Sequence, residues 1–177
     1  MKLQKHAKRT FISLNRMFLY KLYCHIISFV KKFFFKLIYG KKLHIGKNFQ
    51  FRKWFTLLLE GGEISIGDNV FFNNSCTVCA KQKIIIGNGS IFGENVKIFD
   101  HNHKYTSTDI LIKHQGYITA PIYIGNNCWI GSNVIILKGV TIGDNCVIGA
   151  GCVIFKDVPN RTMVINKQNL LYKEIKD

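Results

Sequence analysis

Residues 121–159 read PIYIGNNCWIGSNVIILKGVTIGDNCVIGAGCVIFKDVP, and an isoleucine recurs there at every sixth position. Glycine follows four of the six isoleucines, and a small or branched residue lies four positions after each of the first five. A period of six fits neither an α-helix nor a half-buried strand, but it is typical of a solenoid built from hexapeptides. We therefore expect each hexapeptide to form one short strand, with its isoleucine inside and its glycine at a tight corner. The isoleucines are Ile124, Ile130, Ile136, Ile142, Ile148 and Ile154.

A weaker form of the same repeat extends upstream from Ile66 to Ile98, and the period is lost in residues 100–121. The sequence therefore predicts an all-β solenoid, a parallel β-helix of about five coils, with a protruding loop where the period fails. The predicted division of the chain is a basic amphipathic helical segment at residues 1–42, the hexapeptide β-helix at residues 43–160 and a C-terminal tail at residues 161–177.

The six cysteines in this chain of 177 residues do not indicate disulfides. Four of them occupy the small position of a hexapeptide, where a reduced thiol packs as a small hydrophobe. No CxxC pair has a matching partner pair, which excludes a zinc ribbon. We therefore expect packed, reduced cysteines and a cytoplasmic protein. The four cysteines are Cys76, Cys128, Cys146 and Cys152.

The formal net charge of +15 lies almost entirely in residues 1–59, which carry fourteen Lys or Arg and no acid. In residues 1–42 the bases alternate with Phe, Leu, Ile and Tyr, which predicts two short amphipathic helices, or one whose polar face shifts along its length. The longest uncharged run, residues 22–30, is too short for a membrane span of ~20 residues. Such a surface favours binding to an anionic membrane. A packing cap on the solenoid end is the second interpretation, and without a recognition motif no nucleic acid is expected as a partner.

The loop at residues 100–121 carries the candidate catalytic residues. It opens with Asp100-His101-Asn102-His103 and also contains His114. A long loop in an otherwise strict solenoid usually serves binding or catalysis, and neutral imidazole is an effective general base near pH 7. Asp100 is a candidate to orient an imidazole, although adjacent side chains on an extended segment point apart. No metal is expected, because His-x-His without a third nearby ligand is a weak metal signal.

The run from Pro121 to Pro159 resembles the C-terminal half of the hexapeptide acyltransferases. The nearest members are the galactoside, maltose and antibiotic O-acetyltransferases and the sugar O-acetyltransferases of capsule and lipopolysaccharide synthesis. The resemblance covers residues 65–157. It implies a left-handed parallel β-helix assembled as a homotrimer, with acetyl-CoA as co-substrate in the groove between neighbouring subunits.

The resemblance also implies roles for individual residues. His101 occupies the place of the catalytic histidine and would take a proton from the acceptor hydroxyl, and His103 is the alternative base. Asn73 would bind the acceptor, and Trp129 would line the acetyl-transfer site, where it meets both substrates. The positions that match coenzyme contacts are Trp129, Ser132, Ala150 and Lys156.

Two departures from the simple-sugar enzymes affect the expected acceptor. Ala80-Lys81 stands where those enzymes carry acidic residues, and residues 164–167 replace the usual Gly-Val-Pro motif. The sequence therefore predicts an acetyl-CoA-dependent O-acetyltransferase that modifies a cell-surface polysaccharide (capsule, O-antigen or exopolysaccharide) or its precursor at the inner face of the bacterial membrane. Three alternatives remain open: an N-acetyltransferase on an amino sugar, a metal-dependent lyase of the carbonic anhydrase type on the same fold, and a non-catalytic scaffold.

Overall fold

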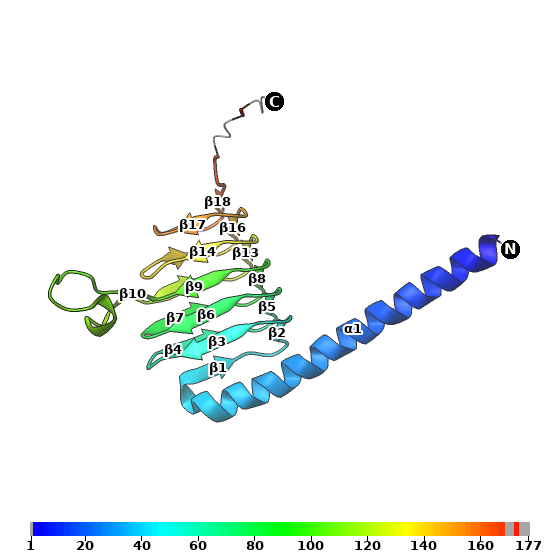
Figure 1. Cartoon of the computed structure of the whole chain (residues 1–177), viewed down its shortest axis with the longest axis horizontal. Coiled ribbons are helices and arrows are strands. Elements are labelled where there is room, and N and C mark those ends of the chain that lie inside the picture. The colour runs from blue at the N-terminus through cyan, green and yellow to red at the C-terminus, as the bar shows by residue number, and fades with distance from the viewer. Residues whose placement is uncertain (1, 169–171, 174–177) are drawn as a thin grey trace.

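The computed structural model describes residues 2–168 and 172–173, with side chains from residue 19 onward except that of Lys21. A long N-terminal helix, α1 (Lys2–Tyr39), leads through a short 3-10 helix, η1 (Gly40–Lys42), into a solenoid of parallel strands. Figure 1 shows the solenoid as a stack of coils, with α1 extending away from its first coil and one hairpin protruding from its side.

Each coil contributes one short strand to each of three parallel sheets, which form the three faces of the solenoid. Face A consists of β1 (Leu43–Ile45), β4 (Glu63–Ile66), β7 (Lys83–Ile86), β12 (Ile122–Ile124) and β15 (Thr141–Ile142). Face B consists of β2 (Gln50–Phe51), β5 (Phe71–Phe72), β8 (Ile91–Phe92), β13 (Trp129–Ile130), β16 (Val147–Ile148) and β18 (Met163–Val164). Face C consists of β3 (Thr56–Leu59), β6 (Thr77–Ala80), β9 (Lys97–Phe99), β14 (Ile135–Ile136) and β17 (Val153–Ile154). The predicted β-solenoid is confirmed, with six strands on face B because β18 pairs with β16.

The interior of the solenoid is filled by the residues that the six-residue period selects. All six isoleucines of the period are buried, and each stacks on the equivalent residue of a neighbouring coil, as Ile130 does on Phe92 and Ile148. Buried thiols fill the small positions, and the Cys128 thiol donates a hydrogen bond to the carbonyl of Gly143 (3.1 Å). Burial raises the pKa of Cys128, so this thiol stays protonated. In the described part of the chain all six cysteines are free.

The corners of the solenoid make two demands, space for the next coil and a left-handed backbone, and these fall at different positions. At Gly125 the demand is space, because a Cβ there would lie 2.7 Å from the backbone nitrogen of Asp144 in the next coil. The left-handed backbone conformation falls at other corner positions, and six of these are asparagines whose φ angles lie between 52° and 58°. Their side chains hydrogen-bond from coil to coil, as Asn127 does to Asn145 (2.9 Å). The asparagines are Asn48, Asn69, Asn95, Asn127, Asn133 and Asn145.

Residues 2–39 form one continuous helix rather than two. Gly40, at φ +53°, ends it. The end of α1 covers the open first coil: the Phe35 ring lies 6.2 Å from that of Phe51, and the Tyr39 hydroxyl donates to the carbonyl of Leu57 (3.1 Å). The capping interpretation therefore holds for this end of the helix. Among the described residues, no helix combines the length and apolarity that a bilayer span requires.

The stacked core predicts the cost of removing one interior side chain. Ile130→Ala should lower the free energy of unfolding by ~2–5 kcal/mol, because neighbouring coils cannot close the cavity. Thermal melting followed by circular dichroism would show a drop of ~2–4 °C per kcal/mol. Thr141→Ala, on the exposed side of face A, is the matched control and should leave the melting temperature nearly unchanged. Equal effects of the two substitutions would contradict the packing described above.

Candidate active site at a corner of the solenoid

The loop that interrupts the repeat is an ordered antiparallel hairpin. Its strands are β10 (His101–His103) and β11 (Tyr117–Thr119), and a 3-10 turn, η2 (Ile112–His114), lies between them. His101 pairs with Thr119 and His103 pairs with Tyr117. The hairpin leaves the solenoid directly after β9, at the corner between faces C and A (Figure 1).

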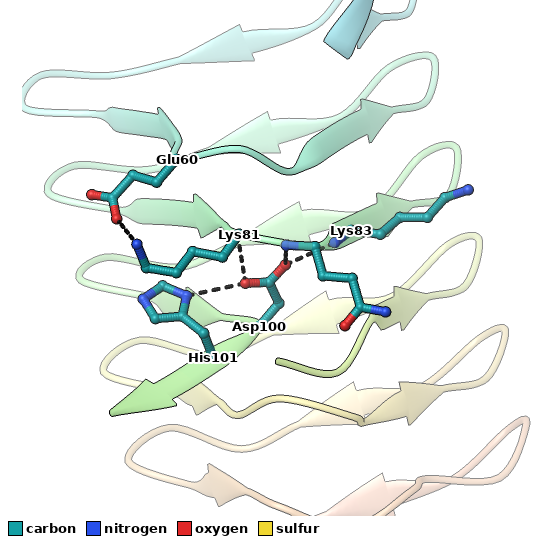
Figure 2. A network of polar contacts seen from close by, with 6 residues as sticks. Glu60, Lys81, Lys83, Asp100 and His101 are labelled. Carbon is teal, nitrogen blue, oxygen red and sulfur yellow. Dashed lines mark hydrogen bonds and ion pairs between the residues drawn. The ribbon is translucent and has the colours of Figure 1, made fainter. Parts of the chain in front are cut away.

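Asp100 fixes the base of this hairpin. Its side chain is fully buried and stacks on Ala80 of the preceding coil. The carboxylate accepts hydrogen bonds from the backbone N–H groups of Lys81 (2.8 Å), Gln82 (2.7 Å) and Lys83 (2.8 Å), as Figure 2 shows. Three donors compensate the loss of water around a buried carboxylate, which would otherwise be costly. The aspartate therefore ties the corner of one coil to the start of the hairpin in the next.

The same carboxylate also holds the His101 ring. Oδ1 of Asp100 lies 3.0 Å from Nδ1 of His101, and only 13% of the histidine side chain is exposed. The expectation that adjacent side chains point apart fails here, because the chain turns at the corner between β9 and β10. A carboxylate only accepts, so in the neutral imidazole Nδ1 carries the proton and Nε2 presents a lone pair. This is the arrangement that orients an imidazole for general-base work.

The other two histidines of the loop lack this support. His103 is exposed, its ring centre lies 4.5 Å from that of Tyr117, and among the described residues no hydrogen-bond partner of its ring is found. The His101 ring meets the same tyrosine edge-on at 5.4 Å. His114 is exposed on η2, away from the hairpin base. Within one chain the three histidines therefore do not form the triad that a carbonic-anhydrase-like site needs.

Glu60 and Lys81, which the sequence did not indicate as site residues, border the histidine. The ammonium of Lys81 pairs with the carboxylate of Glu60, as Figure 2 shows. The same ammonium lies 3.7 Å from the centre of the Tyr117 ring. The hydrogen bond between Lys81 and Glu60 lowers the pKa of Glu60 and raises that of Lys81, so both stay charged. Glu60, Lys81 and His101 follow three consecutive strands of face C. From the sequence, only the alignment of successive coils could have predicted that these three residues lie side by side.

One group of metal-type donors lies in this corner. Among the described residues, Glu60, Cys79 and His101 bring one donor atom each within 4.8 Å of one another. Burial raises the pKa of Cys79 to about 11, which keeps the thiol protonated and a poor ligand. The carboxylate of Glu60 is already paired with Lys81. The donor chemistry of this group therefore does not fit a resident divalent cation.

The residues assigned to acceptor and coenzyme are spread over the solenoid instead of gathering around His101. Ser132 and Ala150 stack at the corner between faces B and C, and Asn73 lies at the same corner nearer the first coil. Trp129 is 56% exposed on the outer side of face B. Lys156 lies instead at the corner between faces C and A, in the residue column of Asp100. One chain therefore places these residues on both sides of face C and does not bring them into a single pocket.

Asn73 is held by its neighbours rather than free to rotate. Its side-chain oxygen accepts hydrogen bonds from the guanidinium of Arg52 (3.1 Å) and the backbone N–H of Asn74 (2.9 Å). The side-chain amide nitrogen remains as a donor for another group. At the same corner, the hydroxyl of Ser132 accepts the backbone N–H of Glu94 (3.1 Å). These contacts give the corner a fixed polar surface.

Comparison with known proteins agrees with the repeat and the fold. Residues 121–156 match the family described as bacterial transferase hexapeptide (six repeats). The galactoside O-acetyltransferase of Escherichia coli is 38% identical over 117 residues, which cover 66% of this chain and 57% of that protein. The structure of a maltose O-acetyltransferase from Clostridium difficile is 31% identical, with a TM-score of 0.59 over 80% of this chain and 75% of that one. A hexapeptide-repeat acetyltransferase from Vibrio cholerae, solved with acetyl coenzyme A, is 30% identical with a TM-score of 0.58 over 76% and 72%.

The chain matches only part of the length of these relatives. The chain spans about 60% of the length of two galactoside O-acetyltransferases, 63% in Lactococcus lactis and 57% in Escherichia coli. The hexapeptide family, whose model matches residues 121–156, implies the left-handed winding that the resemblance predicts. From the repeat, the three-faced β-helix and these matches together, the chain belongs to the hexapeptide-repeat acetyltransferases.

Proposed function

We propose that this protein transfers the acetyl group of acetyl-CoA to a sugar hydroxyl, with His101 as the general base. The observation that carries this proposal is the buried Asp100 carboxylate, which holds Nδ1 of His101 and leaves Nε2 for the acceptor. Family membership supports the reaction, since the similar proteins are named sugar O-acetyltransferases and one similar structure holds acetyl coenzyme A. An amino-sugar acceptor would use the same base, and the preference for a hydroxyl rests on the O-acetyltransferase relatives.

The proposed reaction is a direct transfer without a covalent enzyme intermediate. Nε2 of His101 takes the hydroxyl proton while the acceptor oxygen attacks the thioester carbonyl. The tetrahedral intermediate then expels the coenzyme thiolate, which receives the proton from the imidazolium. Such general-base assistance is worth ~10²–10⁴ in rate. Alignment of the two substrates supplies much of the remainder.

We also propose that the active assembly is a homotrimer. Asn73, Ser132 and Ala150 lie at one corner of face C, and His101 and Lys156 lie at the other. Strand β6 alone, with four residues at ~3.3 Å each, separates the two corners by ~13 Å. A neighbouring subunit whose corner faces His101 would complete a site for both substrates, with Trp129 and Lys156 beside the coenzyme. A closed ring of three gives every subunit the same contact.

We further propose that the acceptor is a cell-surface polysaccharide or its lipid-linked precursor, met at the inner face of the bacterial membrane. Residues 1–42 contain eleven bases and no acid. Along its described part α1 also leaves large apolar side chains exposed, among them Leu19, Ile26 and Phe33. Bases beside apolar side chains are the pattern of a segment that lies on anionic lipid. Since the end of α1 also caps the solenoid, the two roles fall on different parts of one helix.

The base assignment is tested by three histidine variants. His101→Ala should reduce acetyl transfer at least ~10²-fold, because no other group replaces the oriented imidazole. Release of the coenzyme thiol would be followed with a panel of sugar acceptors, and circular dichroism would confirm folding. His114→Ala, at the exposed hairpin turn, is the matched control and should retain full activity. If His103→Ala carried the loss while His101→Ala stayed active, the base would be His103.

The assembly is tested by its mass and by coenzyme binding. Multi-angle light scattering should give three times the chain mass of 20.3 kDa. Calorimetry should give one acetyl-CoA per chain, because a ring of three subunits has three contacts and each contact would form one site. A monomer that binds acetyl-CoA with full affinity would contradict the shared site.

The membrane proposal is tested by vesicle flotation with the full chain. Replacing Lys2, Lys5, Lys8, Arg9 and Arg16 by glutamine should release the protein from anionic vesicles, because each base near the surface contributes up to ~1 kcal/mol. Binding of the unaltered chain should also fall at 1 M salt, where the Debye length is ~3 Å. Lys104→Gln with Lys113→Gln, on the hairpin, is the control and should float normally. Equal flotation with neutral and anionic vesicles, or none with either, would contradict binding to anionic lipid and would show that α1 only caps the solenoid.

A further inference from the structure

A groove lies between α1 and the first coils of face B, at the base of the solenoid. Its volume is about 610 Å³, within the range of ~300–1,000 Å³ that is usual for ligand sites. Much of its wall is aromatic: Phe29 comes from the helix, and Phe49, Phe51 and Phe71 come from the first two coils. A groove of this kind accommodates an apolar chain.

The groove also contains a buried polar group without a partner. Ser28 is only 4% exposed, and its hydroxyl oxygen makes no hydrogen bond to the described residues. Leaving such a buried hydroxyl unpaired is energetically unfavourable. Since Ser28 belongs to the groove lining, a ligand with an acceptor oxygen would satisfy it. The helix therefore presents a hydrogen-bond donor where the fold itself does not use one.

Two cations line the same groove as this hydroxyl. The Lys32 ammonium donates to the carbonyl of Phe49 (3.1 Å), and burial lowers its pKa, so a bound anion would offset the cost of its charge. The Arg52 guanidinium lies 5.5 Å from the centre of the Phe71 ring. Among the described residues that line the groove, none carries a carboxylate. A lysine, an arginine and a serine hydroxyl are typical donors to a phosphate group.

Arg52 connects this groove with the acceptor side of the site. The same guanidinium that lines the groove donates a hydrogen bond to the side chain of Asn73 (3.1 Å). Asn73 is the residue proposed above to bind the acceptor. We propose that the groove binds a lipid phosphate, with the phosphate on Ser28, Lys32 and Arg52 and the first part of the chain on the phenylalanines. This inference rests on the proposed function, and it identifies the acceptor class as a glycan carried on a lipid phosphate.

The test uses decyl phosphate below its micelle concentration, added to the full chain in a calorimeter. We expect one binding event per chain, at least ~10-fold tighter than for inorganic phosphate or for neutral decyl maltoside. Equal binding of inorganic phosphate would show a free-anion site, and equal binding of decyl maltoside would show an apolar groove only. Either result, or no binding, would overturn the proposal.

Variants locate the binding event. Arg52→Gln and Lys32→Gln should each weaken decyl phosphate binding at least ~10-fold. Lys31→Gln is the matched control, because its ammonium contacts the carbonyl of Phe55 (3.4 Å) and does not line the groove. Ser28→Leu should block the phosphate position and weaken decyl phosphate binding at least ~10-fold without lowering the melting temperature, since it removes an unpaired hydroxyl. Unchanged binding in Arg52→Gln and Ser28→Leu would overturn the assignment.

Acetyl-CoA binding in the same samples separates this inference from the function on which it rests. Lys32 and Ser28 lie in the first part of the chain, away from Ser132, Ala150 and Lys156. Loss of decyl phosphate binding with intact acetyl-CoA binding is the result expected for their variants. An unaltered chain that binds acetyl-CoA but not decyl phosphate would overturn the groove proposal alone. An unaltered chain that does not bind acetyl-CoA would overturn the proposed function itself.

Discussion

Every part of this structure depends on the in-register stacking of parallel coils. Adjacent strands lie ~4.8 Å apart, so each residue must fit on the equivalent residue of the coils before and after it. Inside, branched and aromatic side chains meet this demand in continuous columns such as Phe92–Ile130–Ile148. At the corners the same demand excludes any side chain from Gly125, where the next coil leaves no room for a Cβ. Regular stacking thus explains both the period of six and the residue types that carry it.

The candidate site lies where one column departs from this rule. Ala80 is followed in its column by Asp100, a charged residue at a position that other coils fill without a buried charge. The corner is stable because the N–H groups of residues 81–83 all point at the carboxylate. The repeat therefore supplies a rigid, pre-formed cradle for the aspartate, and the aspartate in turn fixes His101. The hairpin inserted after this point adds Tyr117 beside the imidazole.

Features of this structure that depend on neighbouring residues in the sequence could be predicted, and features that depend on contacts between distant residues could not. The fold was predictable because the six-residue period of residues such as Ile124 and Ile130 repeats one local rule. The loop and its Asp100-His101 pair were found because they interrupt that rule. The Glu60–Lys81 pair was not found, since the two residues lie 21 positions apart and meet only through coil register. The sequence left open whether residues 1–42 form two helices or one, because their polar positions shift from face to face, and the structure has one continuous helix, α1.

The contact between Phe35 and the first coil has a consequence for how solenoids end. An uncovered coil presents unpaired backbone groups and an open apolar core, which is a template on which another chain can add. Here Phe35, Tyr39 and Lys32 cover that surface, and two of the backbone carbonyls beneath it accept their hydrogen bonds. The helix thereby caps the first coil. With this end covered, a second molecule cannot extend the parallel sheets, so the molecules do not associate end to end into a fibre.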